Sequence, residues 1–334
     1  MKYSVIVPVY NRPQEIRELL DSLSQQADPP QFEVIVIEDG STIRCEDVVS
    51  QFSGLNIRYL YKENSGPGDS RNVGMRMALG EYFLIFDSDC ILPPNYLKTV
   101  EDELTHSPVD FFGGPDGALD SFSDIQKAIN FAMTSFLTTG GIRGGSEQLD
   151  RFQPRSFNMG ISRKAFEASG GFGDIHPGED PDLAIRLWKL GFKSRLLPGA
   201  LVYHKRRIDW KKFALQVRKF GKARPILDAW HPQFRKWSYL FPSVFIMGIP
   251  IAVLLAVSGI YVFVAGYILY FSLVFLLASM RTKSIGIGAL SVLAVWNQFY
   301  GYGVGYLESF VKIGLQKREP RKVFPELFFK KSQK

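Results

Sequence analysis

Cysteine is scarce in this chain of 334 residues, which contains only Cys45 and Cys90. The two lie in different predicted segments without the spacing of a metal motif, so a cysteine-based metal module is excluded and two reduced thiols are expected. A secretory signal is also absent, because the apolar run Val5–Val9 ends at Asn11-Arg12-Pro13 and is too short for the apolar core of such a signal. We therefore expect the N-terminal part of the chain to stay in the cytosol.

Charge is absent from one long stretch, the 42 residues Tyr239–Met280. As a continuous helix this stretch would extend about 63 Å at 1.5 Å per residue. The hydrocarbon core of a bilayer is only about 30 Å thick, so two spans fit, with a turn near Ser258-Gly259. The alternative, a buried helical hairpin of a soluble protein, has no need of so long an apolar run.

A third apolar segment, Ile285–Leu307, is more polar and is followed by a basic tail. Eleven Lys and Arg residues lie between His204 and Trp237, and eight more follow from Val311 onward. Positive charge next to a span favours the cytosolic side, so both flanks are expected there. Three full spans would place the tail outside; either the tail is external despite its charge, or the third segment is re-entrant or interfacial.

The net charge of +7 suits nucleic acid, anionic lipid or phosphate-bearing substrates. Much of it lies in the run 204–237, which adjoins a predicted span, so membrane lipids explain it and nucleic acid is not an expected partner. Apolar residues recur at helical spacing within Trp210–Phe220, between lysines and arginines. This pattern predicts either a helix in the membrane interface or a solvated helix packed on the soluble part.

Short β-branched runs alternate with amphipathic stretches over residues 1–115. The predicted strands are Tyr3–Val9, Phe32–Glu38, Ile57–Tyr61 and Tyr82–Phe86, and the predicted helices are Arg12–Gln26, Cys45–Phe52, Gly68–Leu79 and Pro94–Thr105. Such alternation predicts a mostly parallel, Rossmann-like sheet with helices on both faces. Ligands of these sheets bind beyond the carboxyl ends of the strands.

Polar residues follow each of the four strands. The strand ends are Pro8-Val9-Tyr10-Asn11, Glu38-Asp39-Gly40-Ser41, Asn64-Ser65-Gly66 with Arg71 on the next helix, and Asp87-Ser88-Asp89. Asp87 and Asp89 can both reach one hard divalent cation, Arg71 can neutralise a phosphate or pair with an aspartate, and Asp39 can bind a base or ribose. Taken singly, Asp-Gly-Ser is also an ordinary turn and Asp-x-Asp can be a helix cap.

As an ordered set, these motifs resemble the family 2 glycosyltransferases, which have the GT-A fold. The matching pieces are Val5-Ile-Val-Pro-Val-Tyr-Asn11, Glu38-Asp-Gly-Ser41, Arg71-Asn72-x-Gly74, Asp87-Ser-Asp89, Asn158-Met159-Gly160, Gly170-Gly171-Phe172 and Glu179-Asp180-x-Asp182-Leu183. The resemblance covers about residues 1–205, and the apolar C-terminal region is similar to that of bacterial members that build exopolysaccharide or lipid-linked glycan. One departure is Glu38, where the family more often has Asp.

The resemblance implies a role for each matching residue. Asp180 would be the catalytic base, with Glu179 beside it. The donor, a UDP- or GDP-linked sugar, would contact Pro8, Tyr10, Asn11, Asp39, Arg71, Asp87 and Ser88. Mg2+ or Mn2+ would be held by Asp87 and Asp89, with His204 near the metal or diphosphate; alternatively His204 is a structural histidine.

Asp180 also has a simpler interpretation, as the N-cap of a helix that starts at Pro181. If it is a base, it accepts the proton of an acceptor hydroxyl, and the configuration at the anomeric carbon inverts. A phosphate acceptor is already ionised and needs no such base. The motif therefore favours a sugar hydroxyl over a bare polyprenyl phosphate. The glycine-rich stretch around Arg143 is either a mobile loop that closes over a substrate or a plain linker.

These observations predict four regions: a GT-A domain at 1–205, a basic interfacial helix or linker at 206–237, transmembrane helices at 238–310 and a basic tail at 311–334. The predicted function is that of an inverting hexosyltransferase acting on a lipid-linked glycan at the bacterial inner membrane, with its catalytic domain in the cytosol. The alternatives are a polyprenyl-phosphate glycosyltransferase and a non-catalytic membrane scaffold.

Overall fold

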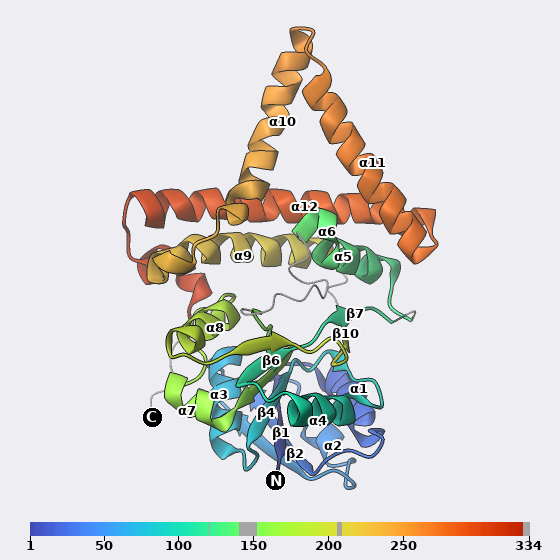
Figure 1. The fold of residues 1–334 in the computed structure, drawn as a ribbon, viewed down its shortest axis with the longest axis vertical. Coiled ribbons are helices and arrows are strands. Elements are labelled where there is room, and N and C mark those ends of the chain that lie inside the picture. The colour runs from blue at the N-terminus through green and yellow to red at the C-terminus, as the bar shows by residue number, and fades with distance from the viewer. Residues whose placement is uncertain (120, 140–151, 206–208, 330–334) are drawn as a thin grey trace. The chain divides into compact units, whose positions relative to one another are not determined.

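The computed structural model describes residues 1–119, 121–139, 152–205 and 209–329 (Figure 1). The chain divides into two compact units: one combines Met1–Gly117, Gly145–Lys205 and Phe328–Lys334, and the other combines Ala118–Gly144 and Arg206–Leu327. The described residues between 118 and 139 thus group with the C-terminal helices, and Phe328 and Phe329 group with the N-terminal unit. Most of the glycine-rich stretch predicted as a loop, residues 140–151, lies outside the described residues.

A seven-stranded sheet in the order β3-β2-β1-β4-β8-β6-β9 forms the centre of the N-terminal unit. The strands are β1 Tyr3–Val9, β2 Phe32–Asp39, β3 Ile57–Lys62, β4 Tyr82–Phe86, β6 Phe111–Gly113, β8 Asn158–Ser162 and β9 Ser194–Leu196. The first four are parallel to one another, and β8 is antiparallel to both of its neighbours. The predicted mostly parallel α/β sheet is confirmed, with β2 and β3 one residue longer than expected.

Helices cover both faces of this sheet, so its strands are buried on both sides. On one face lie α1 Pro13–Ser24, α2 Glu46–Val49 and α4 Tyr96–His106; on the other lie α3 Pro67–Met77, α7 Arg163–Ser169 and α8 Glu179–Lys189. Strand β1 supplies both cores, with Val5 and Val7 packing toward the first face and Ile6 toward the second. This alternation follows from the two-residue period of a strand, and it explains the continuous apolar run in the sequence.

A smaller three-stranded sheet adjoins the end of β4 in sequence. It consists of β5 Cys90–Ile91, β10 Val202–His204 and β7 Asp116–Gly117, with β10 in the middle. In the antiparallel pairing of β10 with β5, His204 lies opposite Cys90. A histidine more than a hundred residues away in sequence is thereby brought to the Asp-x-Asp motif.

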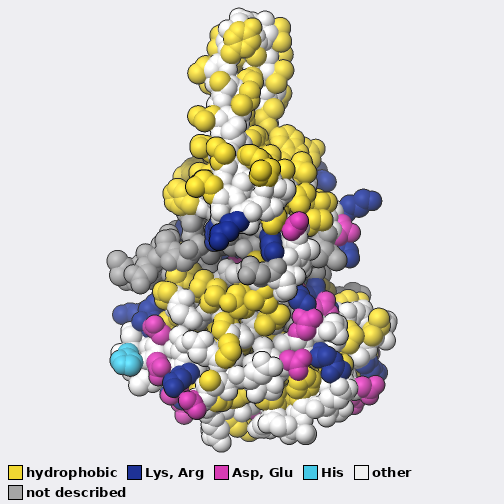
Figure 2. Space-filling model, turned by 90° about the vertical axis from the view of Figure 1, so that its right-hand side faces the viewer, with side chains coloured by type: hydrophobic (Ala, Val, Ile, Leu, Met, Phe, Trp, Pro, Cys, Tyr) yellow, Lys and Arg dark blue, Asp and Glu magenta, His cyan; other side chains and the backbone are white. Residues whose placement is uncertain are grey.

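The second unit is helical. Its main helices are α5 Asp124–Thr134, α6 Phe136–Thr139, α9 Trp210–Trp230, α10 Phe241–Val257, α11 Val262–Thr282, α12 Ile285–Ser309 and α13 Pro320–Val323, with a π-helical turn at Phe310–Leu315. Among the described residues, two segments are long and apolar enough to cross a membrane, Trp237–Val257 and Val262–Thr282, and only 11% of each apolar window is buried. The chain reverses between them at Ser258-Gly259, as predicted. On the face shown in Figure 2, hydrophobic side chains cover this hairpin.

The third apolar segment forms α12, which packs lengthwise against α9 within the helical unit (Figure 1). Glycines allow the close approach: a Cβ added at Gly301 or Gly305 would collide with α9, at 2.6 Å from the Val217 side chain and 2.2 Å from the Arg218 carbonyl oxygen. Glu308 at the end of α12 lies 3.1 Å from the guanidinium of Arg218. Among the described residues, α12 is not one of the helices that are long and apolar enough to cross a membrane.

Candidate active site

The loops after β1 and β2 are fastened together by Asn11. Its side-chain Oδ1 accepts hydrogen bonds from the backbone N–H groups of Thr42 (2.8 Å) and Ile43 (3.0 Å). Its own backbone N–H donates to Ser41 Oγ at 2.8 Å. Asn11, predicted to touch the donor, thus shapes the rim of the site, while the neighbouring Tyr10 side chain is 53% exposed.

Asp39, at the end of β2, is buried and oriented by the loop that follows β3. Its carboxylate accepts hydrogen bonds from the backbone N–H groups of Ser65 (3.0 Å) and Gly66 (2.9 Å), and the Lys62 ammonium donates to it as well. This arrangement fixes the carboxylate between β2 and the first turn of α3. Lys62 was missed by the sequence reasoning, although it is the last residue of a strand and so obeys the same positional rule as Asp39.

Arg71 joins the end of β4 to the start of α8. The side chain is only 3% exposed; Nη2 donates to Asp87 Oδ1 at 2.7 Å, and Nη1 lies 3.3 Å from Glu179 Oε1. Of the two roles considered for Arg71, pairing with an aspartate is the one observed. A buried guanidinium with five donors suits this bridging role, and it brings together two carboxylate motifs about ninety residues apart in sequence.

Asp89 lies between His204 and Arg12. Its Oδ1 is 3.1 Å from His204 Nε2, and Arg12 donates to Oδ2. Burial alone would raise the pKa of Asp89, but His204 and Arg12 together lower it well below its usual range. The His204 ring stacks on Phe157 at 4.6 Å, which fixes its orientation.

A carboxylate oxygen and an imidazole nitrogen this close together fit a small divalent cation. The side chains of Asp89, Cys90 and His204 offer ligand atoms within 4.8 Å of one another. The Cys90 thiol donates to the Phe157 carbonyl oxygen at 3.3 Å, and a thiol is a poor ligand for Mg2+. Asp87 is instead held by Arg71, so the structure brings together two of the three predicted metal ligands, Asp89 and His204.

Asp180 is the second residue of α8 rather than its N-cap. The helix begins at Glu179 after Gly178, whose φ of 127° few other residues adopt, so the predicted start at Pro181 was wrong. The Asp180 carboxylate accepts from the Ser156 backbone N–H, and its Oδ1 has no hydrogen-bond partner among the described residues. Burial and the negative charge of Glu179 raise the pKa of Asp180 to about 6, which suits a general base near neutral pH.

Glu179 itself remains ionised. Burial alone would raise its pKa, but the hydrogen bond and charge of His176, then the charge of Arg71, lower it. His176 Nδ1 lies 2.8 Å from Glu179 Oε1, and the pKa of His176 is raised by that carboxylate against the effect of burial. His176, like Arg12, was missed by the sequence reasoning; its only signal is its position just before the Gly-Glu-Asp motif.

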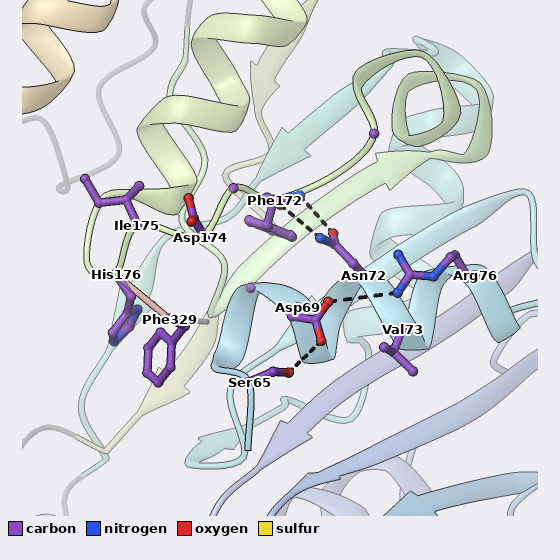
Figure 3. Close-up of a pocket in the computed structure, with 13 residues that line it drawn as sticks. Ser65, Asp69, Asn72, Val73, Arg76, Phe172, Asp174, Ile175, His176 and Phe329 are labelled. Carbon is purple, nitrogen blue, oxygen red and sulfur yellow. Dashed lines mark hydrogen bonds and ion pairs between the residues drawn. The ribbon is translucent and has the colours of Figure 1, made fainter. Parts of the chain in front are cut away.

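A pocket of about 330 Å3 lies beside this network, between α3 and the loop that leads to α8 (Figure 3). In its wall Ser65 donates to Asp69 at 2.6 Å, and the Asn72 side chain exchanges hydrogen bonds of 2.9 and 2.8 Å with the Phe172 backbone. His176 and Phe329 face each other across one end of the pocket. Four of the residues that line the pocket belong to motifs noted in the sequence, although no role was predicted for them: Ser65, Asn72, Gly170 and Phe172.

Solved glycosyltransferase structures are similar to this chain along most of its length. Staphylococcus aureus TarS 1–349 in complex with UDP-GlcNAc aligns over 95% of this chain and 93% of that chain, at 19% identity and a TM-score of 0.51. The mannosyltransferase PcManGT from Pyrobaculum calidifontis, in complex with GDP-Man and Mn2+, aligns over 95% of this chain and 88% of that chain, at 19% identity and a TM-score of 0.57. At these identities the similarity shows the fold alone, which is GT-A.

Curated relatives match shorter segments. The poly(ribitol-phosphate) beta-N-acetylglucosaminyltransferase TarS of Staphylococcus aureus is 41% identical over 102 residues, which cover 29% of this chain and 18% of TarS. Chondroitin synthase of Escherichia coli is 26% identical over 234 residues, which cover 60% of this chain and 34% of that protein. The matches therefore span well under two thirds of either relative. The sequence profile of glycosyl transferase family 2 matches residues 4–170, half of the chain, and the protein belongs to this family, as its motifs predicted.

Proposed function

We propose that this protein transfers a sugar from a nucleotide-linked donor to a hydroxyl group of a glycan acceptor, with inversion at the anomeric carbon. The observation that carries the proposal is the Arg71 bridge, which holds Asp87 of the Asp-x-Asp motif against Glu179, the residue next to Asp180. In this proposal Asp87 lies on the side of the sugar donor and Asp180 on the side of the acceptor, and both are at the same edge of the sheet. The UDP-GlcNAc and GDP-Man complexes of the two structural neighbours support a nucleotide-sugar donor of the UDP or GDP type.

In this proposal Asp39 and the loops around Tyr10 and Asn11 bind the nucleoside, and Arg71 and Ser88 lie toward the diphosphate. Asp180 accepts the proton of the acceptor hydroxyl while that oxygen attacks the anomeric carbon. The bond from this carbon to the diphosphate oxygen breaks, and its electron pair leaves with the nucleoside diphosphate. Attack from the face opposite the leaving group inverts the configuration.

A divalent cation, Mg2+ or Mn2+, would be held by Asp89 and His204, with Asp87 completing the set if it exchanges Arg71 for the metal. Bound there, the cation supplies positive charge that stabilises the diphosphate as its charge grows. The Mn2+ in the PcManGT complex supports a metal of this kind. Arg12 and Arg71 contribute fixed positive charge beside the same carboxylates.

A carboxyl group with a pKa near 6 favours a hydroxyl acceptor over polyprenyl phosphate, which brings no proton to remove. The two apolar helices and the basic helix α9 support an acceptor that is lipid-linked and reached at a membrane surface. The Lys and Arg residues that flank the two apolar helices support a placement in the bacterial inner membrane with the catalytic unit in the cytosol. A non-catalytic scaffold would not require the paired carboxylates and the buried Arg71 of this site.

The test uses membranes containing the full chain, incubated with UDP- and GDP-sugars and Mg2+ or Mn2+, with released nucleoside diphosphate as the readout. Asp180→Asn is expected to lower transfer to a sugar hydroxyl by about 10²- to 10⁴-fold, the usual contribution of a general base. Asp21→Asn, at an exposed position on α1, is the matched control and should behave as wild type. Absence of release with every donor would refute the enzyme; full activity of Asp180→Asn would refute the hydroxyl mechanism.

A further inference from the structure

The segment Phe328-Phe329 is attached to the catalytic unit through its backbone. The Phe329 N–H donates to the Asp174 carbonyl oxygen at 3.0 Å, and Phe328 forms an antiparallel bridge with Ile175. The segment therefore extends the loop 170–176, which leads directly into the Gly-Glu-Asp motif. Both phenylalanines are half-buried.

The Phe329 ring lies against the loop that holds Asp39. A Cβ added at Gly66 would lie 2.3 Å from a Phe329 ring carbon, so the ring is in direct contact with the Gly66 backbone. Gly66, with φ of 94°, has the conformation that glycine favours, and its N–H is one of the donors to Asp39. The Phe329 ring thus touches the loop Ser65-Gly66, here called the donor loop, beside the hydrogen bond from the Gly66 N–H to Asp39.

The same ring touches the loop of the proposed base. The Phe329 and His176 rings are 5.9 Å apart between centroids, at the end of the pocket in Figure 3. His176 contacts Glu179, and Glu179 contacts Arg71. Phe329 therefore closes a connected series of contacts that runs from Asp39 through Gly66 and His176 to Glu179, the neighbour of Asp180.

We propose that Phe329 is a positioning residue that clasps the donor loop Ser65-Gly66 to the loop His176–Glu179. This inference rests on the proposed function for its kinetic part only. Without the ring, the two loops hold their binding arrangement for only a fraction of the time before the donor binds. The apparent affinity for the donor is then reduced in proportion to that fraction. We expect Phe329→Ala to raise the donor KM about tenfold, with a smaller change in kcat, and Phe329→Leu to restore most of the affinity.

The experiment compares wild type, Phe329→Ala, Phe329→Leu and the matched control Phe192→Ala in the full chain. Phe192 is half-buried against the core of the same unit, at the far end of α8 from Asp180. Backbone amide exchange is measured first, because it requires no substrate. Phe329→Ala is expected to speed exchange at Ser65 and Gly66 and at residues 174–176, 178 and 179, whereas Phe192→Ala is expected to leave these amides unchanged.

Unchanged exchange at both loops in Phe329→Ala would overturn the clasp, whether or not the enzyme turns over. Faster exchange with an unaltered donor KM, or an equal rise in Phe192→Ala, would overturn the positioning role. If wild type turns over no donor, the proposed function fails separately. Binding of UDP and GDP with Mn2+ then replaces KM, and equal affinity of wild type and Phe329→Ala overturns the positioning role.

Discussion

Replacing Glu179 by glutamine should shift the acid limb of the pH–rate profile to lower pH. The proposed base, Asp180, works only when ionised, so activity is expected to fall as the pH drops through about 6. Glutamine keeps the shape of Glu179 but removes a negative charge beside Asp180. The ionised form of Asp180 is then less disfavoured, its pKa falls, and the variant keeps more of its own maximal activity in mild acid.

The structure sets the size of this effect. The pKa of Asp180 is raised from 3.8 to about 6, with burial as the largest cause and the charge of Glu179 as the second. The whole shift is about two pH units, so removing its second-largest cause should move the acid limb by roughly one pH unit. The substitution also leaves Arg71 and His176 without the carboxylate of Glu179. The charge of Arg71 already lowers the pKa of Asp180, so the loss of the Glu179 charge and the freeing of Arg71 both lower that pKa.

The assay is kcat/KM for the active donor and acceptor, measured from pH 4.5 to 8 and normalised to each variant's plateau. Normalisation is needed because loss of the Glu179 contact with Arg71 should also lower the plateau. The control is Glu167→Gln, which removes a carboxylate that is 63% exposed on α7 and should leave the acid limb in place. An acid limb that stays fixed or moves upward in Glu179→Gln would refute the assignment of Asp180 as the titrating base.

Three further predictions concern the metal, the donor and the membrane. Asp89→Asn is expected to abolish the stimulation of activity by Mn2+ or Mg2+, whereas EDTA should inactivate wild type reversibly; activity of the variant that still responds to metal would contradict the site. Asp39→Asn should raise the donor KM about tenfold, equivalent to ~1.4 kcal/mol, with little change in kcat, and a pure kcat effect would rule out a nucleoside contact. Because Cys45 and Cys90 are both buried, single cysteines introduced at the exposed positions Ser238, Ser258 and Gln316 can be labelled selectively with an impermeant maleimide. Two spans predict that Ser238 and Gln316 react from one side of the membrane and Ser258 from the other, whereas three spans place Gln316 with Ser258.

The sheet could be predicted from the sequence because its strands are buried on both faces. Burial on two sides produces mostly apolar strands such as Tyr3–Val9, whose bounds were predicted to the residue. No strand was predicted at β8 or β9, because they are three to five residues long and pair with strands distant in sequence. The start of α8 was missed for a local reason: Gly178 at positive φ begins the helix at Glu179, and Pro181 suggested a later start.

Much of the site could also be predicted, since polar residues after parallel strands meet at one edge of the sheet. That rule identified Asp39, Asp87 and Asp89, and it would have identified Lys62 and Arg12 had it been applied to cations as well. His176 and Phe329 could not be found this way. Neither follows a strand of the main sheet, and their positions depend on tertiary contacts between loops that are more than a hundred residues apart.

The charges at this edge explain why the proposed donor should require a cation. Four carboxylates gather there, on Asp87, Asp89, Glu179 and Asp180, and two guanidiniums, of the half-buried Arg12 and the buried Arg71, pair with three of them. Even with Asp180 half protonated near pH 6, the carboxylates outnumber the guanidiniums, so a nucleoside diphosphate alone would bring more negative charge to an already negative edge. A divalent cation at Asp89 and His204 reverses that balance, and it also competes with Arg12 for Asp89. Nucleotide affinity should therefore rise steeply with Mn2+ in wild type and stay low at all Mn2+ concentrations when Asp89 is neutral; equal affinity with and without Mn2+ in wild type would contradict this account of the charges.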